Sequence, residues 1–154
     1  MKISNRLKFA AAAATLFVAT GISAGAEDGW IIKTSAASVE KTADKLVAAV
    51  EKAGAKVFAR VDHSAGAQSI DAELEDMTLV MFGNPKIGTP LLQANPRVGL
   101  DLPNRVLIWD DDGQTRIGYL DPAELKQRYN VERADQAFET MTGALGKLTD
   151  AATK

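Results

Sequence analysis

The chain contains no cysteine and only one histidine, His63, among its 154 residues. The lack of cysteine excludes a cysteine nucleophile, thiolate metal ligands, disulfide bonds and a lipid-modified N-terminal cysteine. A single histidine without cysteine does not supply the ligand set of a closed transition-metal site. We therefore expect no metal and no cofactor, and a fold that is stabilised by packing or by self-association.

An excess of basic residues is also missing. The sequence has 18 Lys and Arg against 20 Asp and Glu, a formal net charge of −2. Proteins that bind nucleic acid carry a basic surface for the phosphate backbone. The charge balance therefore argues against nucleic acid as a partner.

The N-terminal segment has the three parts of a signal peptide. Basic residues come first, followed by the apolar, Ala-rich residues 9–18 and the small-x-small sequence Ala24-Gly25-Ala26. The apolar part is shorter than the roughly 20 residues that a membrane span needs. We expect residues 1–26 to be a signal peptide that is cleaved after Ala26, and residues 27–154 to be a single periplasmic or secreted domain.

Removal of this leader changes the charge but leaves enough chain for a core. Lys2, Arg6 and Lys8 would be lost from the 18 basic residues, which leaves 15 against 20 acidic residues and a net charge of −5. A chain of this length forms one domain with a core of its own. We expect no stable membrane insertion after cleavage.

Hydrophobic periodicity predicts an α+β fold with the order strand, helix, four strands, helix. Strands are expected at residues 30–33, 56–62, 77–82, 105–109 and 115–119, with Asp112-Gly113 as the turn between the last two. A helix from Ser38 to about Gly54 carries the apolar positions Val39, Ala43, Leu46, Val50 and Ala53 on one face. Asp121-Pro122 is typical of another helix start. A final helix carries the stripe Val131, Ala134, Phe138, Met141, Leu145 and Leu148.

These elements predict a mostly antiparallel sheet with helices packed on one face. Residues 56–62 alternate, so Val57, Ala59 and Val61 are expected on one face of their strand, opposite Phe58. The sheet face without helices needs cover, and Phe58, Trp109 and Tyr119 are candidates to lie on it. Exposed apolar patches mark interfaces, so we expect a homodimer or a higher oligomer.

Three blocks of the sequence resemble the signatures of the DUF302 family, a domain family of unknown function. The blocks are Phe58–Ala67 (FARVDHSAGA), Phe82–Leu91 (FGNPKIGTPL) and the group Asp101–Pro103, Val106–Trp109 and Tyr119–Pro122. The likeness covers about residues 30–149. Leu120 and Asp76-Met77 depart from the pattern. The resemblance implies a fold related to the TATA-binding-protein-like group, and dimers or larger assemblies, but it implies no activity.

Candidate site residues lie at the ends of two strands. His63 follows the strand 56–62, where a histidine side chain suits a general base or a ligand contact, or it serves only to fix the following loop. Asn84, Lys86, Gly88 and Thr89 follow the strand 77–82 in a segment rich in Gly and Pro. Asn84-Pro85 and Thr89-Pro90 are each typical of a helix start.

Free helix-end N–H groups beside Lys86 suit a small anion. Because neighbouring strands usually pair, we expect His63 to approach Asn84, Lys86 and Thr89. Asp110, Asp111 and Asp112 precede a tight turn and lack the spacing of a calcium loop, so we interpret them as turn residues.

Three functions remain open from the sequence. The first is a small-molecule or anion binding and sensing module, with a pocket under residues 84–93. The second is a hydrolase or lyase type of enzyme that uses His63 as acid or base with Lys86 as an electrostatic aid. The third is a structural or interaction subunit of a homo-oligomer. We favour the first, because the shaped turn after a buried strand is typical of a ligand site.

Overall fold

The computed structural model describes residues 26–27 and 29–154, so the expected leader lies outside the described residues except for Ala26. The described chain forms a six-stranded antiparallel sheet in the order β1-β2-β6-β5-β4-β3. The strands are β1 (Ala26–Glu27), β2 (Trp30–Thr34), β3 (Lys56–Asp62), β4 (Met77–Gly83), β5 (Asn104–Asp111) and β6 (Gln114–Leu120). The helices are α1 (Val39–Lys52), α2 (His63–Gln68), α3 (Pro85–Ala94), α4 (Pro122–Arg128), α5 (Asp135–Thr153) and the short 3-10 helix η1 (Pro96–Leu100).

The predicted α+β class and the pairing of the strands at 56–62 and 77–82 are confirmed. The sequence did not predict β1 or α2.

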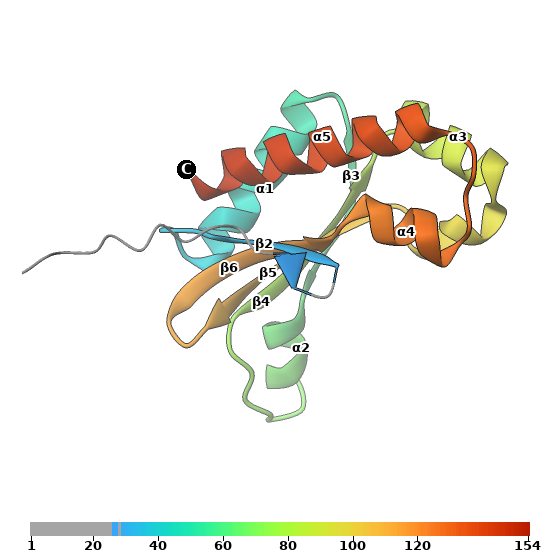
Figure 1. Cartoon of the computed structure of the whole chain (residues 1–154). Coiled ribbons are helices and arrows are strands. Elements are labelled where there is room, and N and C mark those ends of the chain that lie inside the picture. The colour runs from blue at the N-terminus through green and yellow to red at the C-terminus, as the bar shows by residue number, and fades with distance from the viewer. Residues whose placement is uncertain (1–25, 28) are drawn as a thin grey trace, which may run out of the picture.

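The helices are distributed unequally over the two faces of the sheet (Figure 1). α1 and α5 pack against each other across one face, while α3 and α4 lie at one end of that layer. α2 lies on the other side of the sheet. The core lies between the sheet and the helices and contains buried residues from both layers: Val80, Phe82, Val106, Ile108 and Ile117 from the strands, and Leu46, Val50, Phe138, Met141 and Leu145 from the helices.

Both ends of α1 follow from the sequence. The Ser38 side chain accepts a hydrogen bond from the Lys41 amide and caps the first turn. Gly54 adopts φ +73° after the last turn, and the amides of Gly54 and Ala55 donate to the carbonyls of Glu51 and Val50. Only glycine takes this left-handed position without strain, so Gly54 ends the helix.

The last helix begins later than the apolar stripe suggests. α5 starts at Asp135, and Ala134 lies just before it in the left-handed region with φ +68°. Val131 is buried, yet it belongs to the loop between α4 and α5. The stripe therefore predicted the buried positions correctly except for Ala134, which is half-buried, but it was wrong for the start of the helix, because a loop residue can fill the same layer as the helix that follows.

The second face of the sheet has no layer of helices over it within the described part of the chain. We call this surface the open face. The strand register places on it Trp30, Ile32, Met77, Leu79, Met81, Leu107, Trp109 and Leu120, together with Arg105 and Arg116. Trp109 lies there as predicted, across Gly118, where a Cβ atom would come within 3.2 Å of the indole. The prediction for Tyr119 was wrong: it pairs with Ile31 and is buried under the helices.

The alternation predicted for residues 56–62 is interrupted by a bulge. Val57 pairs with Phe82, but Ala59 pairs with Met81, so Phe58 is an extra residue on β3. A bulge shifts the side-chain alternation by one position. Val57 therefore faces the helices while Ala59 and Val61 lie on the open face, and Phe58 is left 51% exposed at the end of the sheet.

The turn between β5 and β6 is the one that the sequence predicts. Asp112 and Gly113 adopt φ +52° and +84°, which is typical of a two-residue hairpin turn. The Asp110 carboxylate accepts a hydrogen bond of 2.6 Å from the Gly113 amide. No group of three or more His, Asp or Glu side chains among the described residues is arranged to hold a metal ion.

Candidate functional site

The strand pairing separates the two groups of candidate site residues. β3 and β4 are antiparallel, so Asp62 pairs with Thr78 and Lys56 pairs with Gly83. His63 follows the end of β3, whereas Asn84 follows the end of β4. The strand between these two ends is about 20 Å long at about 3.3 Å per residue. The expected approach of His63 to Asn84 and Lys86 is therefore wrong, because antiparallel neighbours place their C-terminal ends at opposite edges of the sheet.

The surroundings of His63 are those of a helix start. The Asp62 carboxylate caps α2 by accepting hydrogen bonds from the Ser64 hydroxyl at 2.6 Å and the Ala65 amide at 2.9 Å. These bonds hold the pKa of Asp62 below its usual value. The Ser64 hydroxyl also lies 3.4 Å from the Met77 amide and joins α2 to β4. His63 itself is exposed, and Asp62 is engaged with its neighbours rather than with the imidazole.

At the opposite end, Asn84 starts α3 as predicted. Its side chain accepts a hydrogen bond of 2.9 Å from the Lys86 amide, and Pro85 occupies the first helical position. The Asn84 carbonyl accepts from the amides of Ile87 and Gly88. The first-turn N–H groups that an anion would need are therefore already bonded within the chain.

Thr89-Pro90 does not start a second helix, so that prediction was wrong. α3 runs without a break from Pro85 to Ala94 with Pro90 inside it. A proline at this position removes one hydrogen bond to the preceding turn. The helix continues despite the lost hydrogen bond because its next residue, Leu91, is completely buried in the core.

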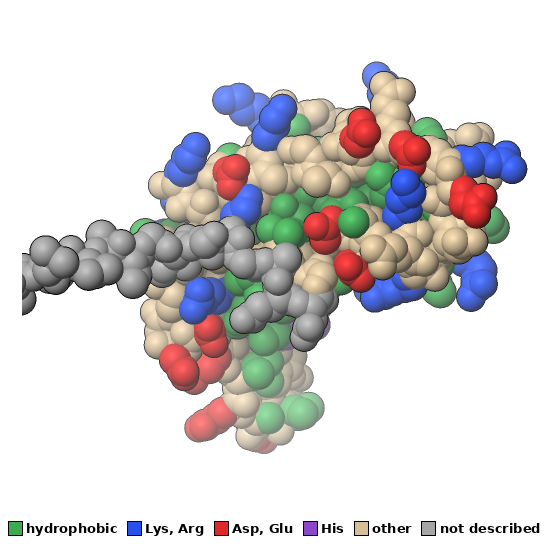
Figure 2. Space-filling view, in the orientation of Figure 1, with side chains coloured by type: hydrophobic (Ala, Val, Ile, Leu, Met, Phe, Trp, Pro, Cys, Tyr) green, Lys and Arg blue, Asp and Glu red, His purple; other side chains and the backbone are tan. Residues whose placement is uncertain are grey.

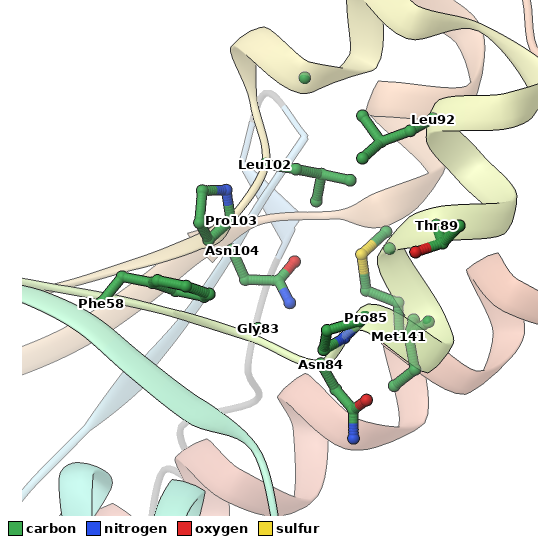
Figure 3. Close-up of a pocket in the computed structure, with 13 residues that line it drawn as sticks. Phe58, Gly83, Asn84, Pro85, Thr89, Leu92, Leu102, Pro103, Asn104 and Met141 are labelled. Atoms are coloured by element: carbon green, nitrogen blue, oxygen red, sulfur yellow. The ribbon is translucent and has the colours of Figure 1, made fainter.

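α3 forms one wall of a cavity of about 330 Å³ at this end of the sheet (Figure 3). Three of the sequence candidates, Asn84, Gly88 and Thr89, line it. Lys86 is exposed on the same helix and does not line it, and His63 lies at the far end of β3. The other lining residues are Phe58, Gly83, Pro85, Ile87, Leu92, Gly99, Leu102, Pro103, Asn104 and Met141.

The close-up shows how the cavity is built. Phe58 lies along one side of the cavity, and Leu92 and Leu102 lie next to each other on a second side. Met141 reaches the cavity from α5. The Asn104 side chain points into the middle of this group, whereas the Asn84 side chain points away from it. The Asn104 carboxamide is thus placed to donate a hydrogen bond to a ligand and to accept one from it.

Asn104 and Met141 were missed as site residues. Asn104 pairs with Phe82 at the start of β5, and only this register brings it beside the start of α3. Met141 belongs to the helical stripe and was assigned to the core. No local motif marks either residue, since each reaches the cavity through a long-range contact.

A network around Asp101 fixes the cavity wall that contains Leu102 and Pro103. The Asp101 carboxylate accepts hydrogen bonds from Tyr129 at 2.7 Å and Arg128 at 2.9 Å, and it forms an ion pair with Arg105. Burial opposes ionisation, but the bonds from Tyr129 and Arg128 and the charge of Arg105 outweigh it and hold the pKa of Asp101 below its usual value. Asn95 also donates to the Tyr129 carbonyl at 2.8 Å. The end of α4 therefore holds both ends of η1.

The lining of the cavity contains no titratable side chain: none of its residues is an acid, a base or a histidine. A general acid–base reaction needs a titratable group within reach of the reacting atoms. Apolar walls with a few polar groups instead suit a small molecule that is mostly apolar.

This chain is similar to known proteins in both sequence and fold. Residues 31–148 match the model of the family described as "Domain of unknown function DUF302". The crystal structure of an uncharacterised conserved DUF302 protein from Bacillus stearothermophilus superposes with a TM-score of 0.75 and 18% identity. The match covers 82% of this chain and 99% of that one, and at this identity it supports the fold alone.

Curated relatives are similar over most of this chain but only part of their own. The Fluoride-specific ion channel FluC 1 of Brucella suis biovar 1 is 38% identical over 125 residues, which are 80% of this chain and 49% of that protein. The protein of the same name from Brucella abortus biovar 1 has the same identity, with 46% of its length covered.

The chain thus spans about half the length of these relatives. None of the helices in the described residues is long and apolar enough to cross a membrane. The family match extends over most of the chain and includes all three sequence blocks, and the chain therefore belongs to the DUF302 family.

Proposed function

We propose that this DUF302 domain is an exported binding module for a small, uncharged and mostly apolar molecule. The observation that carries the proposal is the cavity of about 330 Å³, with apolar walls and the Asn104 carboxamide pointing into it. Cavities that bind small molecules begin at about 300 Å³ and combine apolar walls with a few directed polar groups. The ligand would place its apolar body between Phe58, Leu102 and Met141, and one hydrogen-bonding group on Asn104.

The charge of the site narrows the ligand class. A bound anion or cation needs an opposite charge or several free donors or acceptors once water is removed. The cavity lining offers no charged side chain, and the first-turn amides of α3 are bonded to Asn84. An uncharged alcohol, amide or ketone with a short hydrocarbon body fits these walls better than a carboxylate or a phosphate.

Ligand binding can be tested by filling the cavity. Gly88 lines it on α3, so Gly88→Phe would place a ring in the space. Gly143→Phe is the matched control, because Gly143 is exposed on α5 with nothing within 4 Å of a Cβ atom.

A panel of short-chain alcohols, amides and ketones would be screened by thermal shift and calorimetry. We expect binding by wild type and Gly143→Phe and loss of binding by Gly88→Phe. Weaker binding by Asn104→Leu would assign the hydrogen bond. Equal binding by wild type and Gly88→Phe would contradict the proposal.

A second candidate is the binding of a small anion, and the names of the relatives favour it. The Brucella proteins are called fluoride channels, and this chain is similar to about half of each. The place for such an ion would be the surface beside Lys86, which is exposed in the first turn of α3. Fluorine NMR of sodium fluoride with the protein would test it. If the fluoride signal is as broad with Lys86→Ala as with wild type, this candidate is ruled out. It is also ruled out if neither protein broadens the signal.

A further inference from the structure

Two of the side chains that line the cavity contact aromatic rings more favourably than aliphatic groups. Phe58 contributes a phenyl ring from β3, and Met141 contributes a thioether from α5. Figure 3 shows the ring and the sulfur well apart, with the Asn104 carboxamide reaching in between them. Aromatic pairs and contacts between sulfur and a ring are stronger than the burial of the same apolar area alone. These two side chains therefore favour a ligand that contains an aromatic ring.

The ring of Phe58 is held at the edge of the cavity by its neighbours. Phe58 is the extra residue of the bulge on β3. A Cβ atom on Gly83 would lie 3.6 Å from the ring and 3.6 Å from Pro103, so the ring lies close to this glycine and beside the proline. The Lys56 ammonium is 5.4 Å from the ring centroid, a cation–π distance. The ring is therefore fixed in place while half of it remains free to contact a ligand.

The cavity also has a narrow shape. α3 forms one wall, and residues 99–104 form the opposite wall. A Cβ atom on Gly99 would lie 3.3 Å from Leu92, and a Cβ atom on Gly88 would lie 3.9 Å from Leu102. The two walls therefore meet at these points, and the space between them opens only towards the end of the sheet. A flat molecule fills such a wedge better than a thick one.

Size and charge limit the ligand further. A cavity of about 150 Å³ is enough for benzene, so the volume of about 330 Å³ takes one ring with a short substituent. The Asn104 carboxamide can donate and accept a hydrogen bond, which suits a hydroxyl or an amide on that substituent. Lys and Arg side chains lie among Asp and Glu side chains over the helix layer in Figure 2, so this face has no broad field of one sign that would attract a charged ligand.

We propose that the ligand of the cavity is a single aromatic ring with a short uncharged substituent that ends in a hydroxyl or an amide. This inference rests on the proposed function and narrows its ligand class. The ring lies in the wedge, in contact with the Phe58 ring and the Met141 sulfur. The hydroxyl or amide is hydrogen-bonded to Asn104.

Benzyl alcohol and cyclohexylmethanol test the ring directly. The two molecules have the same number of non-hydrogen atoms and the same hydroxyl group, and they differ only in the ring. Cyclohexylmethanol has the larger apolar surface, so burial alone would favour it. Aromatic contacts would favour benzyl alcohol instead. We expect calorimetry to give benzyl alcohol a dissociation constant at least about fivefold lower.

Two variants show whether Phe58 causes this preference. Phe58→Leu keeps an apolar side chain but removes the ring, and we expect the preference to fall below about twofold, mainly through weaker binding of benzyl alcohol. Trp30→Leu is the matched control, because Trp30 is also a partly exposed aromatic residue but lies on the open face. This control should keep the preference of wild type.

Methionine methyl NMR gives a second readout inside the cavity. A bound aromatic ring shifts the signal of a nearby methyl group through its ring current, and a cyclohexyl ring has no such current. We expect benzyl alcohol to shift the Met141 methyl signal, which Met141→Leu would assign. The signals of Met77 and Met81 should stay in place, because both residues lie on the open face.

The outcomes separate this inference from the proposed function. If neither alcohol binds, both are contradicted. If both alcohols bind and cyclohexylmethanol binds as tightly or more tightly, the cavity is a binding site but the aromatic class is wrong. A preference that Phe58→Leu retains, or a Met141 signal that benzyl alcohol leaves in place, would also overturn the inference.

Discussion

At the scale of single residues, Asp101 joins three separate parts of the chain. It follows η1 and is bonded to Arg105 of β5 and to Arg128 and Tyr129 at the end of α4. Its side chain is 11% exposed, which is low for a carboxylate. The network holds Leu102 and Pro103 against the cavity, so the conformation of the site depends on a charged group that does not itself touch the space.

The stability that Asp101 provides should depend on pH. Its pKa is lower in the folded protein than in the unfolded chain, so its contribution is complete above about pH 4 and is lost as the pH falls through the folded pKa. We expect Asp101→Asn to lower the free energy of unfolding by about 1.5–3 kcal/mol at pH 7, the range for a hydrogen bond to a charged group. The difference from wild type should shrink as the pH falls below about 4 and the carboxylate of the folded protein becomes protonated.

Denaturant titrations of wild type, Asp101→Asn and Glu139→Gln would measure this. Glu139 is exposed on α5 and serves as the control for loss of one negative charge. A pH-independent difference between wild type and Asp101→Asn would mean that the carboxylate stabilises the fold through its shape rather than its charge.

The residues of the candidate site show what the sequence can and cannot predict. Asn84 was found because a helix cap is a local signal, in which the side chain bonds to an amide two residues later. Asn104 was not found, because its position depends on pairing with Phe82 and on the direction of its side chain. The expected approach of His63 to Asn84 was wrong, because the sequence predicted that the two strands pair but not that they run antiparallel.

At the scale of elements, local signals predicted where segments start and end better than where they meet. The caps of α1 and the hairpin turn at Asp112-Gly113 match the structure. The pairing of the strands at 56–62 and 77–82 was predicted correctly. Their antiparallel direction was not predicted, so the segments that follow them were expected at the same end of the sheet instead of at opposite ends. The bulge at Phe58 also had no local signal, since it arises from the fit between β3 and β4.

Two glycines beside helices should respond oppositely to the same substitution. Gly54 has φ +73°, so Gly54→Ala should cost about 1–2 kcal/mol because a Cβ atom is strained there. Gly88 lies inside α3, and a Cβ atom would meet only Leu102 at 3.9 Å, an ordinary contact. Gly88→Ala should therefore stabilise the fold by about 0.5–1 kcal/mol. The urea midpoint should fall for Gly54→Ala and rise for Gly88→Ala. Destabilisation by Gly88→Ala would mean that α3 is packed more tightly than a distance of 3.9 Å to Leu102 indicates.

The contact between α1 and the sheet can be measured with two leucines. Leu46 is completely buried and Leu100 is 78% exposed. We expect Leu46→Ala to lower the free energy of unfolding by about 2–5 kcal/mol through the cavity that it leaves. Leu100→Ala should change it by less than about 0.5 kcal/mol in the monomer, as at other surface sites. Similar values for the two variants in a denaturant titration would contradict the assignment of the core face.

At the scale of the whole molecule, helices cover one face of the sheet, and the other face has no layer of helices over it in the described part of the chain. The helices bury one face, whereas on the open face Trp30 is 39% exposed and Trp109 is half-buried. The sequence predicted an uncovered face from the number of helices, but it placed Tyr119 there because the period of two does not tell which side of a strand faces the helices. The register of β2 and β6 settles this point.

Export is a proposal about the whole chain that rests on the sequence of its N-terminal segment rather than on the fold. We predict that the protein is cleaved after Ala26 and that the mature domain begins at Glu27, because Ala24 and Ala26 provide the small side chains that the cleavage site requires. Expression of the full sequence in a Gram-negative host, followed by intact-mass measurement of the periplasmic fraction, would check the start. Ala24→Leu combined with Ala26→Leu is the control, and it should leave the uncleaved chain with the membrane. A wild-type protein that retains Met1 would contradict cleavage after Ala26. If both proteins are found in the cytoplasm, the chain is not exported and a ligand has to be sought among the molecules inside the cell.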